Sequence, residues 1–319
     1  MNRLLYVFVA ALLASTFPDT SAQALNARSW VSSTGTGSTC TRALPCAAFA
    51  TAHDATIAGG TIHCVDGNDY TVGGTSFLIT KSLTIDCAGT QAIHGGQNNI
   101  DDNGAGIVVH LRNLLIDGRG VGDTGVNFIN GAALYIENCT ISGWVTAGIK
   151  FAPPVGVTAK LVVLDSTIVD NGNGVVGSGG IFIQPTGSGV ARVSIDRTKI
   201  VGNQYGIFAD GTIGTGLVTA LIKDSYIANS VFHGVTLSTS GSAAQISITM
   251  DHSASVGNGG DGIESLGSKA FAVLTESTVI GNFGTGLHSV SGGNIFSYRN
   301  NATTGNVTEG GPNNFFGLN

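Results

Sequence analysis

A short phrase that returns seven times between residues 136 and 306 constrains the fold of this chain more than any other feature. Each copy runs apolar residue, any residue, Asp or Asn, a small residue, any residue, Ile or Val, two further residues and Asn, with Gly-Ile following shortly after. The clearest copies are VLDSTIVDN, which ends at Asn171, and LTESTVIGN, which ends at Asn282. The last position is occupied in turn by Trp144, Asn171, Asn203, Ser230, Asn258, Asn282 and Asn306. Repeats spaced by 24 to 32 residues indicate a solenoid, in which each unit buries its apolar face on its neighbours.

The repeats alternate apolar and polar residues with a period of two, which is typical of strands rather than helices. Three apolar columns recur in every copy, so we expect three strands per turn. The fold class predicted is therefore all-β, a right-handed parallel β-helix of about ten coils with a roughly triangular section. The columns are Ile136, Val163, Ile195, Ile222, Met250 and Leu274; Ile141, Ile168, Ile200, Ile227 and Val279; and Ile149, Ile181, Ile207, Val235, Ile263 and Leu287.

The repeated phrases also carry a family resemblance. The sequences NCTI ending at Ile141, DSTI ending at Ile168 and ESTV ending at Val279, each followed by Gly-Ile or Gly-Leu, resemble the right-handed parallel β-helix repeat proteins of the pectate-lyase-like superfamily. The match extends over residues 46–310. The resemblance implies the fold, whereas this architecture supports lyases, hydrolases, adhesins and inert proteins alike.

The first 24 residues have the composition of a secretory signal peptide. Arg3 supplies the basic start, residues 4–14 are apolar, and Ala22-Gln23-Ala24 matches a small-residue cleavage site. We therefore expect a secreted protein, periplasmic or extracellular, that has no membrane span and acts as a monomer. Residues 25–45 should form an extended N-terminal segment and residues 46–319 the β-helix domain. An Ala-rich stretch with helical spacing at residues 46–58 should form a capping helix over the first coil.

Five cysteines remain after the predicted cleavage site. Export permits disulfides. Cys40 and Cys46 bracket a short loop, and Cys64 and Cys87 lie one coil apart, where a disulfide between adjacent strands is geometrically feasible. Sequence alone leaves the pairing open. Cys139 falls in the small-residue column and is expected to be a buried, unreactive thiol.

Charge and motif spacing argue against several functions. The net charge is −6 and no basic run occurs, so nucleic-acid binding has little support. Metal spacings such as His-x-x-x-His within HExxH, or paired CxxC, are absent from the sequence, and we expect no metal site or cofactor. Ca²⁺ has only a weak signal, the GGDGI segment at residues 259–263, because no nine-residue period follows it.

Two polar columns are best explained by stability. The Asn column should form an internal ladder of side-chain amides that satisfies buried backbone groups. A second column largely alternates in sign, so neighbours one coil apart should form ion pairs. Its members are Asp165, Arg197, Asp224, His252 and Glu276.

The positions that follow or precede each Gly-Ile pair should face outward on one strand face. Phe182, Tyr205, Phe208 and His288 there are predicted to bind substrate, since aromatic rings stack on sugars. Asp261, Glu264 and His233 are the predicted catalytic residues, because acids and imidazoles transfer protons. The alternative is an ordinary solvated face whose rings cover backbone.

A second outward patch contains Asp196, Lys223 and Asp251, with the two acids two coils apart. It suggests a Ca²⁺-dependent uronate lyase, although the acids are expected to be about 10 Å apart, which is too far to share one ion. The paired acids Asp101 and Asp102 are expected in a Gly/Asn-rich loop outside the repeat columns. Motifs that the resemblance would require for catalysis, such as Asn-Thr-Asp, are missing from the sequence.

Three functions remain open from the sequence. The first is a secreted module that binds a polysaccharide or cell-surface glycan along the Phe182–His288 face. The second is a carbohydrate-active enzyme, a polysaccharide lyase or glycoside hydrolase. The third is a non-catalytic structural or adhesive protein.

Overall fold

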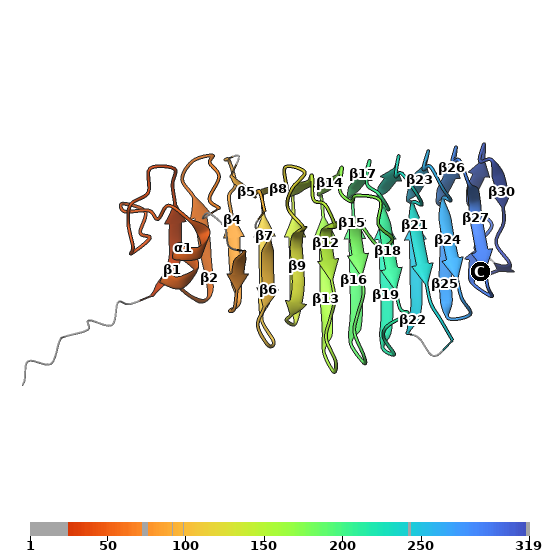
Figure 1. The fold of residues 1–319 in the computed structure, drawn as a ribbon, viewed down its shortest axis with the longest axis horizontal. Helices are drawn as coiled ribbons and strands as arrows, with labels where there is room; N and C mark the ends of the chain where they lie inside the picture. The colour runs from red at the N-terminus through yellow and green to blue at the C-terminus, as the bar shows by residue number, and fades with distance from the viewer. Residues whose placement is uncertain (1–24, 72–75, 91, 98, 242–243, 317–319) are drawn as a thin grey trace, which may run out of the picture.

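The chain folds into an elongated right-handed parallel β-helix, with the described N-terminal coil at one end and the C-terminal coil at the other (Figure 1). The structure is a computed structural model that describes residues 25–71, 76–90, 92–97, 99–241 and 244–316. The predicted signal peptide, residues 1–24, lies outside the described residues. From β4 (Leu83–Asp86) to β30 (Thr308–Gly310), each coil contributes one strand to each of three sheets, here named A, B and C, as the three apolar columns predicted.

Sheet A has 12 strands in the described residues. They are β1 (Asn26–Val31), β2 (Thr56–Cys64), β4 (Leu83–Asp86), β7 (Val108–Arg112), β10 (Ala133–Glu137), β13 (Thr158–Leu164), β16 (Val190–Asp196), β19 (Leu217–Lys223), β22 (Gln245–Asp251), β25 (Ala270–Thr275), β28 (Asn294–Ser297) and β31 (Asn314–Phe315). Its first strand lies within residues 25–45, so the sheet begins ahead of the boundary predicted at residue 46.

Sheets B and C have 9 and 10 strands over the same described ranges, close to the ten coils predicted. Sheet B contains β5 (Ile93–Gly95), β8 (Leu115–Asp117), β11 (Thr140–Ser142), β14 (Thr167–Val169), β17 (Lys199–Val201), β20 (Tyr226–Ala228), β23 (Ala254–Val256), β26 (Thr278–Ile280) and β29 (Ala302–Thr304). Sheet C contains β3 (Phe77–Ile79), β6 (Ile100–Asn103), β9 (Thr124–Asn130), β12 (Ala147–Phe151), β15 (Gly179–Ile183), β18 (Ile207–Asp210), β21 (Val235–Ser238), β24 (Ile263–Leu266), β27 (Thr285–Val290) and β30 (Thr308–Gly310).

The core is built from the predicted columns in register. In sheet A, Ile136 pairs with Val163, and the same row continues along the sheet to Leu274. The rows in sheets B and C are equally continuous, and their aliphatic members are buried. One member of the sheet B row, Ser255, was not predicted from the sequence; it lies between Ile227 and Val279. Its hydroxyl donates a hydrogen bond to the carbonyl of Gly262 at 2.8 Å.

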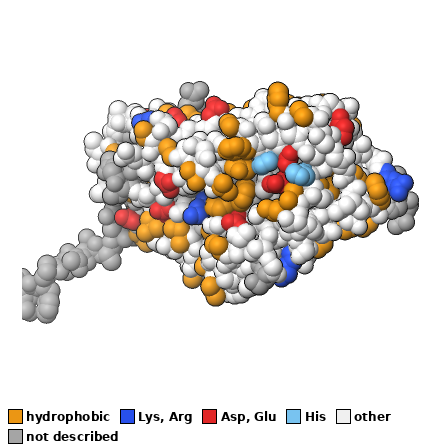
Figure 2. Space-filling view, turned by 45° about the vertical axis from the view of Figure 1, so that its right-hand side comes forward, with side chains coloured by type: hydrophobic (Ala, Val, Ile, Leu, Met, Phe, Trp, Pro, Cys, Tyr) orange, Lys and Arg blue, Asp and Glu red, His pale blue; other side chains and the backbone are white. Residues whose placement is uncertain are grey.

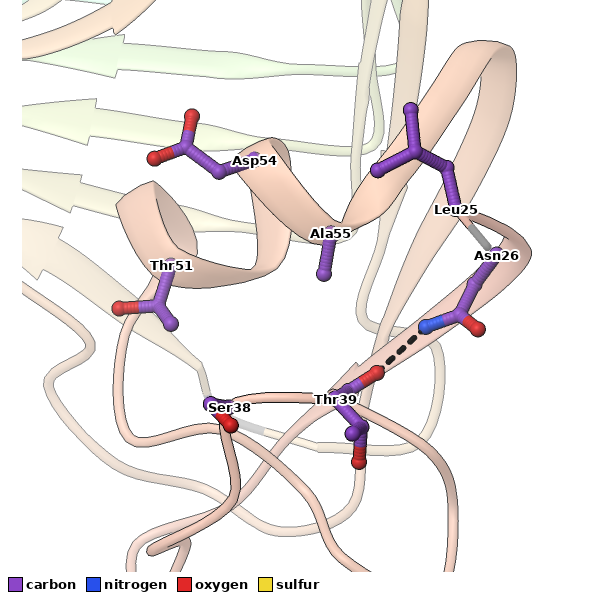
Figure 3. Close-up of a pocket in the computed structure, with 7 residues that line it drawn as sticks. All are labelled: Leu25, Asn26, Ser38, Thr39, Thr51, Asp54 and Ala55. Carbon is purple, nitrogen blue, oxygen red and sulfur yellow. Dashed lines mark hydrogen bonds between the residues drawn. The ribbon is translucent and has the colours of Figure 1, made fainter. Parts of the chain in front are cut away.

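A short helix covers the first coil, as predicted. Helix α1 (Phe49–Ala55) packs against β1, β2 and β3 and buries Phe49, Ala52 and His53. It ends before residue 58 because Thr56 is already extended and begins β2, while its hydroxyl donates to the carbonyl of Ala52. Figure 3 shows a pocket of about 200 Å³ beside this helix, where the Asn26 amide donates to the Thr39 carbonyl.

Both predicted disulfides are formed. Cys40 pairs with Cys46 in the N-terminal loop, and Cys64 pairs with Cys87 across adjacent coils, with a Cα–Cα distance of 4.8 Å. Cys139 is free and buried, and burial raises the pKa of its thiol to about 12. The expectation of an unreactive thiol is therefore supported.

The Asn column forms the internal ladder that the sequence predicted. The Asn258 side chain accepts a hydrogen bond from the backbone N–H of Ser230 at 3.0 Å and donates to Asn282 at 2.8 Å. Asn282 makes the same pair of bonds one coil further on, with Asn258 and Asn306. Each amide therefore satisfies a buried backbone donor in the preceding coil.

The predicted column of alternating charges forms separate ion pairs at the turns between sheets A and B. Arg197 donates two hydrogen bonds to Asp165, at 2.7 and 3.0 Å, and His252 pairs with Glu276. Asp224 instead approaches its neighbour Lys223 at 3.8 Å. All five residues have φ between 45° and 50°, the left-handed conformation that lets one residue turn the chain between two sheets.

The placement of Asp101 and Asp102 in a loop was wrong. Both lie in β6 of sheet C, with Asp101 facing outward and Asp102 in the inward row between Ile79 and Phe128. Asp102 is fully buried, and neither of its carboxyl oxygens has a hydrogen-bond partner. Burial raises its pKa to about 8.

Candidate functional site

The outward face of sheet C brings together the seven residues of the first candidate site that the sequence predicted, with the aromatic and the acidic members on neighbouring coils. One row runs in register from Phe182 through Phe208, Thr236 and Glu264 to His288, across five successive coils. A second row lies in the turns that precede these strands and contains Tyr205, Phe232, His233 and Asp261. We call these nine residues the sheet C patch. Figure 2 shows His and acidic side chains gathered beside a band of hydrophobic side chains on this side of the molecule.

The aromatic part of the patch is a continuous cluster. The Phe208 ring lies 5.7 Å from Phe182 and 5.2 Å from Tyr205, measured between ring centroids. Tyr205 also lies 5.2 Å from Phe232 and 5.7 Å from His233. The rings therefore connect directly to the polar part of the patch.

Burial changes which of these rings can meet a ligand. Tyr205 and Phe208 are only 8% and 7% exposed, so they form the floor of the patch and are not open stacking surfaces. Phe232 is 39% exposed, and Phe182 is partly exposed. Sequence reasoning missed Phe232 because its turn position lies outside the strand columns; its only signal was the position directly before His233.

A loop partly covers the Phe182 end of the patch. An added Cβ on Gly177 would lie 3.2 Å from the Phe182 ring, so this glycine is what allows the loop to approach the ring so closely. Beside it, a hollow of about 240 Å³ is lined by Gly177, Phe182, Phe208, Asp210 and neighbouring residues. The aromatic floor therefore extends into a shallow depression.

Asp261 is the most extensively bonded side chain in the polar part of the patch. One carboxylate oxygen accepts the backbone N–H of Thr285 at 2.6 Å, and the other lies 2.7 Å from Nδ1 of His288. Because a carboxylate only accepts, Nδ1 of His288 must carry a hydrogen, and Nε2 is left as the acceptor in the neutral ring. Asp261 thus holds the His288 ring in one orientation.

His233 is held in the opposite tautomer. Its Nδ1 lies 2.8 Å from the backbone N–H of Asp261, which can only donate. Nδ1 must therefore accept this hydrogen bond, and Nε2 carries the hydrogen. This N–H points toward Glu264, whose nearer oxygen is 3.9 Å away, beyond hydrogen-bond distance.

Two further groups in the patch lack partners for their polar atoms. The Glu264 carboxylate makes no hydrogen bond within the described part of the chain beyond this long approach to His233. Thr236, one coil away in the same row, is 2% exposed, and its hydroxyl has no partner. Burial and the negative charge of Glu264 both raise the pKa of Tyr205, which places this carboxylate in the electrostatic environment of the aromatic floor.

The spacing of three side chains raises the question of a metal ion. One ligand atom each from His233, Asp261 and Glu264 lies within 4.8 Å of the others. However, Nδ1 of His233 and both oxygens of Asp261 are already engaged in hydrogen bonds, and Nε2 of His233 carries a hydrogen. Ca²⁺ additionally prefers six to eight oxygen ligands. A metal ion at this site would therefore require the hydrogen bonds of His233 and Asp261 to rearrange.

The structure also brings together the residues of the second predicted patch, but its acids pair with residues next to them in the sequence. Asp196, Lys223 and Asp251 lie in register on three adjacent strands of sheet A. Asp196 binds Arg197 at 2.7 Å, and Asp251 binds His252 at 2.6 Å. Each acid is thus paired with the turn residue that follows it, which leaves little of this patch for an ion or a uronate.

Comparisons with known proteins identify the fold of this chain but not its function. No protein-family model and no curated protein matches the chain. Among solved structures, the chain is similar to pectate lyase Pel9A, with a TM-score of 0.61 and 14% identity over 92% of this chain and 80% of that one.

Two further solved structures are more distant. ORF18 of Geobacillus virus E2 has a TM-score of 0.46, with 12% identity over 81% of this chain and 56% of that one. A rhamnogalacturonan lyase has a TM-score of 0.33, with 11% identity over 92% and 85%. The first match shows that the chain has the pectate-lyase-like β-helix fold.

The described residues contain no helix long and apolar enough to cross a membrane. The two disulfides fit an oxidising compartment.

Proposed function

We propose that this protein is a secreted glycan-binding β-helix whose recognition surface is the sheet C patch. The observation that carries the proposal is the direct contact between an aromatic cluster and a cluster of His and acidic side chains on one flat face. Sugars have an apolar ring face and a rim of hydroxyls, and they need both kinds of surface. The parallel strands repeat this surface from coil to coil, which suits a long polymer.

The half-exposed rings supply the stacking surface in this proposal. Phe232 lies beside the buried Tyr205, which holds it in place through ring contact. Phe182 occupies the other end of the patch, next to the hollow. Export agrees with the predicted signal peptide and with the two disulfides, and the pectate lyase similarity agrees with a carbohydrate ligand.

A second candidate is catalysis at the same face. The observation that favours it is the Asp261–His288 pair, because a carboxylate that orients an imidazole leaves Nε2 as a proton acceptor. In this arrangement Asp261 is a positioning residue, His288 is the base and Glu264 is the remaining acid. The roles differ from the sequence prediction, which gave proton transfer to Asp261 or Glu264 with help from His233 and assigned His288 to substrate binding.

One set of incubations separates the candidates. The protein from residue 25 onward is incubated with a panel of polysaccharides; binding is measured by affinity electrophoresis and products by mass spectrometry. Retardation by at least one polymer that stays intact is the result expected for a binding module. Oligosaccharide products that disappear in His288→Ala would establish the enzyme. Neither retardation nor products across a broad panel would reject both and favour a structural protein.

A further inference from the structure

We propose that the sheet C patch selects neutral, hydroxyl-rich glycans and rejects uronate polymers. This inference rests on the proposed function and specifies its ligand class. It separates the protein from the pectate lyase that shares its fold, since pectate is an anionic polymer.

The first argument is charge. The strands β15, β18, β21, β24 and β27 and the turns that lead into them contain no Lys or Arg. They contain four acids, Asp170, Asp210, Asp261 and Glu264. Asp261 is bonded to His288, and Asp210 accepts from Gln184 and Thr212, but Glu264 is uncompensated. A carboxylate on every sugar would be repelled by this face, because like charges at close range disfavour each other.

Basic groups stand only at the borders of this face. Lys150 is the nearest in the register, one strand beyond Phe182 on β12, so it meets the aromatic end and not the acidic end. Lys269 follows β24 in the turn toward sheet A. Neither is placed in the row with Glu264 and His288.

The second argument is the inventory of donors and acceptors. His233 presents an N–H donor at Nε2, whereas Glu264 and Nε2 of His288 are acceptors. A carboxylate only accepts and would leave Glu264 and His288 without partners. A hydroxyl both donates and accepts, so neighbouring hydroxyls of one sugar can satisfy the whole set.

The third argument is that the buried hydroxyl of Thr236 has no hydrogen-bond partner. It lies between Phe208 and Glu264 in the outward row, and it is 2% exposed with no hydrogen-bond partner. A buried polar group without a partner is costly, which makes it a candidate contact for a ligand group. A hydroxyl group of a sugar seated over Glu264 could complete this bond without bringing a charge into the patch.

The test compares one polymer with its own charged derivative. The neutral polysaccharide that binds best is oxidised at its C6 hydroxymethyl groups to carboxylates, so that the backbone and linkage stay the same. Binding of both forms is measured at pH 7.5 and low salt with wild type, Glu264→Gln and the control Glu276→Gln. Glu276 is an exposed acid that pairs with His252, away from the patch.

We expect oxidation to weaken wild-type binding by at least about tenfold, which corresponds to about 1.4 kcal/mol. Glu264→Gln should reduce the difference in affinity between the neutral and the oxidised polymer, because it removes the repelling charge. Glu276→Gln should leave this difference unchanged. Equal or tighter binding of the oxidised polymer overturns the inference while the proposed function stands. Failure of every neutral polymer to bind overturns the inference, and the proposed function falls with it only if charged polymers also fail.

Discussion

At the scale of single residues, Asp102 shows how a β-helix can hold a group that its core does not favour. Its carboxyl occupies an inward position between Ile79 and Phe128, where no hydrogen-bond partner satisfies it. The low dielectric disfavours the charged form, so the pKa rises from 3.8 to about 8. The alternation of β6 could not be anticipated from the sequence, because residues 95–106 are rich in Gly, Asn and Asp and carry only Ile100 as a strand signal.

This buried acid predicts a pH-dependent stability. Between about pH 4 and pH 8 the unfolded chain has lost the Asp102 proton and the folded chain keeps it, so stability falls as pH rises. The slope is about 1.4 kcal/mol per pH unit. From pH 5 to pH 7 the wild-type free energy of unfolding should therefore drop about 3 kcal/mol more than that of Asp102→Asn, measured by urea titration. Parallel pH profiles for the two proteins would refute the assignment.

At the scale of elements, the repeated turn holds the coils in register. Asn258 and Asn282 of the internal ladder each bind a backbone N–H one coil back and the next amide one coil forward. The sequence predicted this ladder because buried amides need partners at every coil. It showed Trp144 in place of the first member, but it could not show that the indole N–H donates to the carbonyl of Ile116 at 3.0 Å.

Removing one rung of the ladder should be costly. Asn258→Ala leaves the Ser230 N–H without an acceptor and removes the donors to Ser255 and Asn282. Buried hydrogen-bonding groups left without partners cost about 1–3 kcal/mol, so the unfolding free energy should fall by that amount. The matched control is Asn173→Ala, at an exposed position outside the ladder, which should change stability by less than about 0.5 kcal/mol. Equal effects of the two substitutions on the urea midpoint would contradict the ladder account.

The candidate site illustrates which parts of a site a repeat pattern can reveal. The columns placed Phe182, Phe208, Glu264 and His288 in one outward row, and the structure agrees. The pattern could not indicate how deep each ring lies, because that depends on the turns of neighbouring coils. Tyr205 and Phe208 are therefore floor residues, and alanine at either position should lower thermal stability because of their burial.

At the scale of the whole molecule, the three sheets present different chemistry to solvent. Sheet A carries the patch of Asp196, Lys223 and Asp251, whose acids are paired with their own turn residues. Sheet C carries an acidic and aromatic face in its C-terminal half, with unsatisfied polar groups beside partly exposed rings. The similarity to a pectate lyase, at 14% identity, shows the coil architecture of this protein. The side chains displayed on each sheet decide what the protein binds.

The most direct test of the account is the affinity of the sheet C face for a neutral polysaccharide after loss of one exposed ring. Affinity electrophoresis compares wild type with Phe232→Ala and with the control Phe271→Ala, a ring on the outer face of sheet A. We expect Phe232→Ala to weaken binding by about tenfold, a loss of about 1.4 kcal/mol, because it removes the stacking surface. Its thermal stability should change little, since the ring is 39% exposed, and Phe271→Ala should bind like wild type. Unchanged binding by Phe232→Ala together with a loss in Phe271→Ala would place the ligand on sheet A and contradict the account.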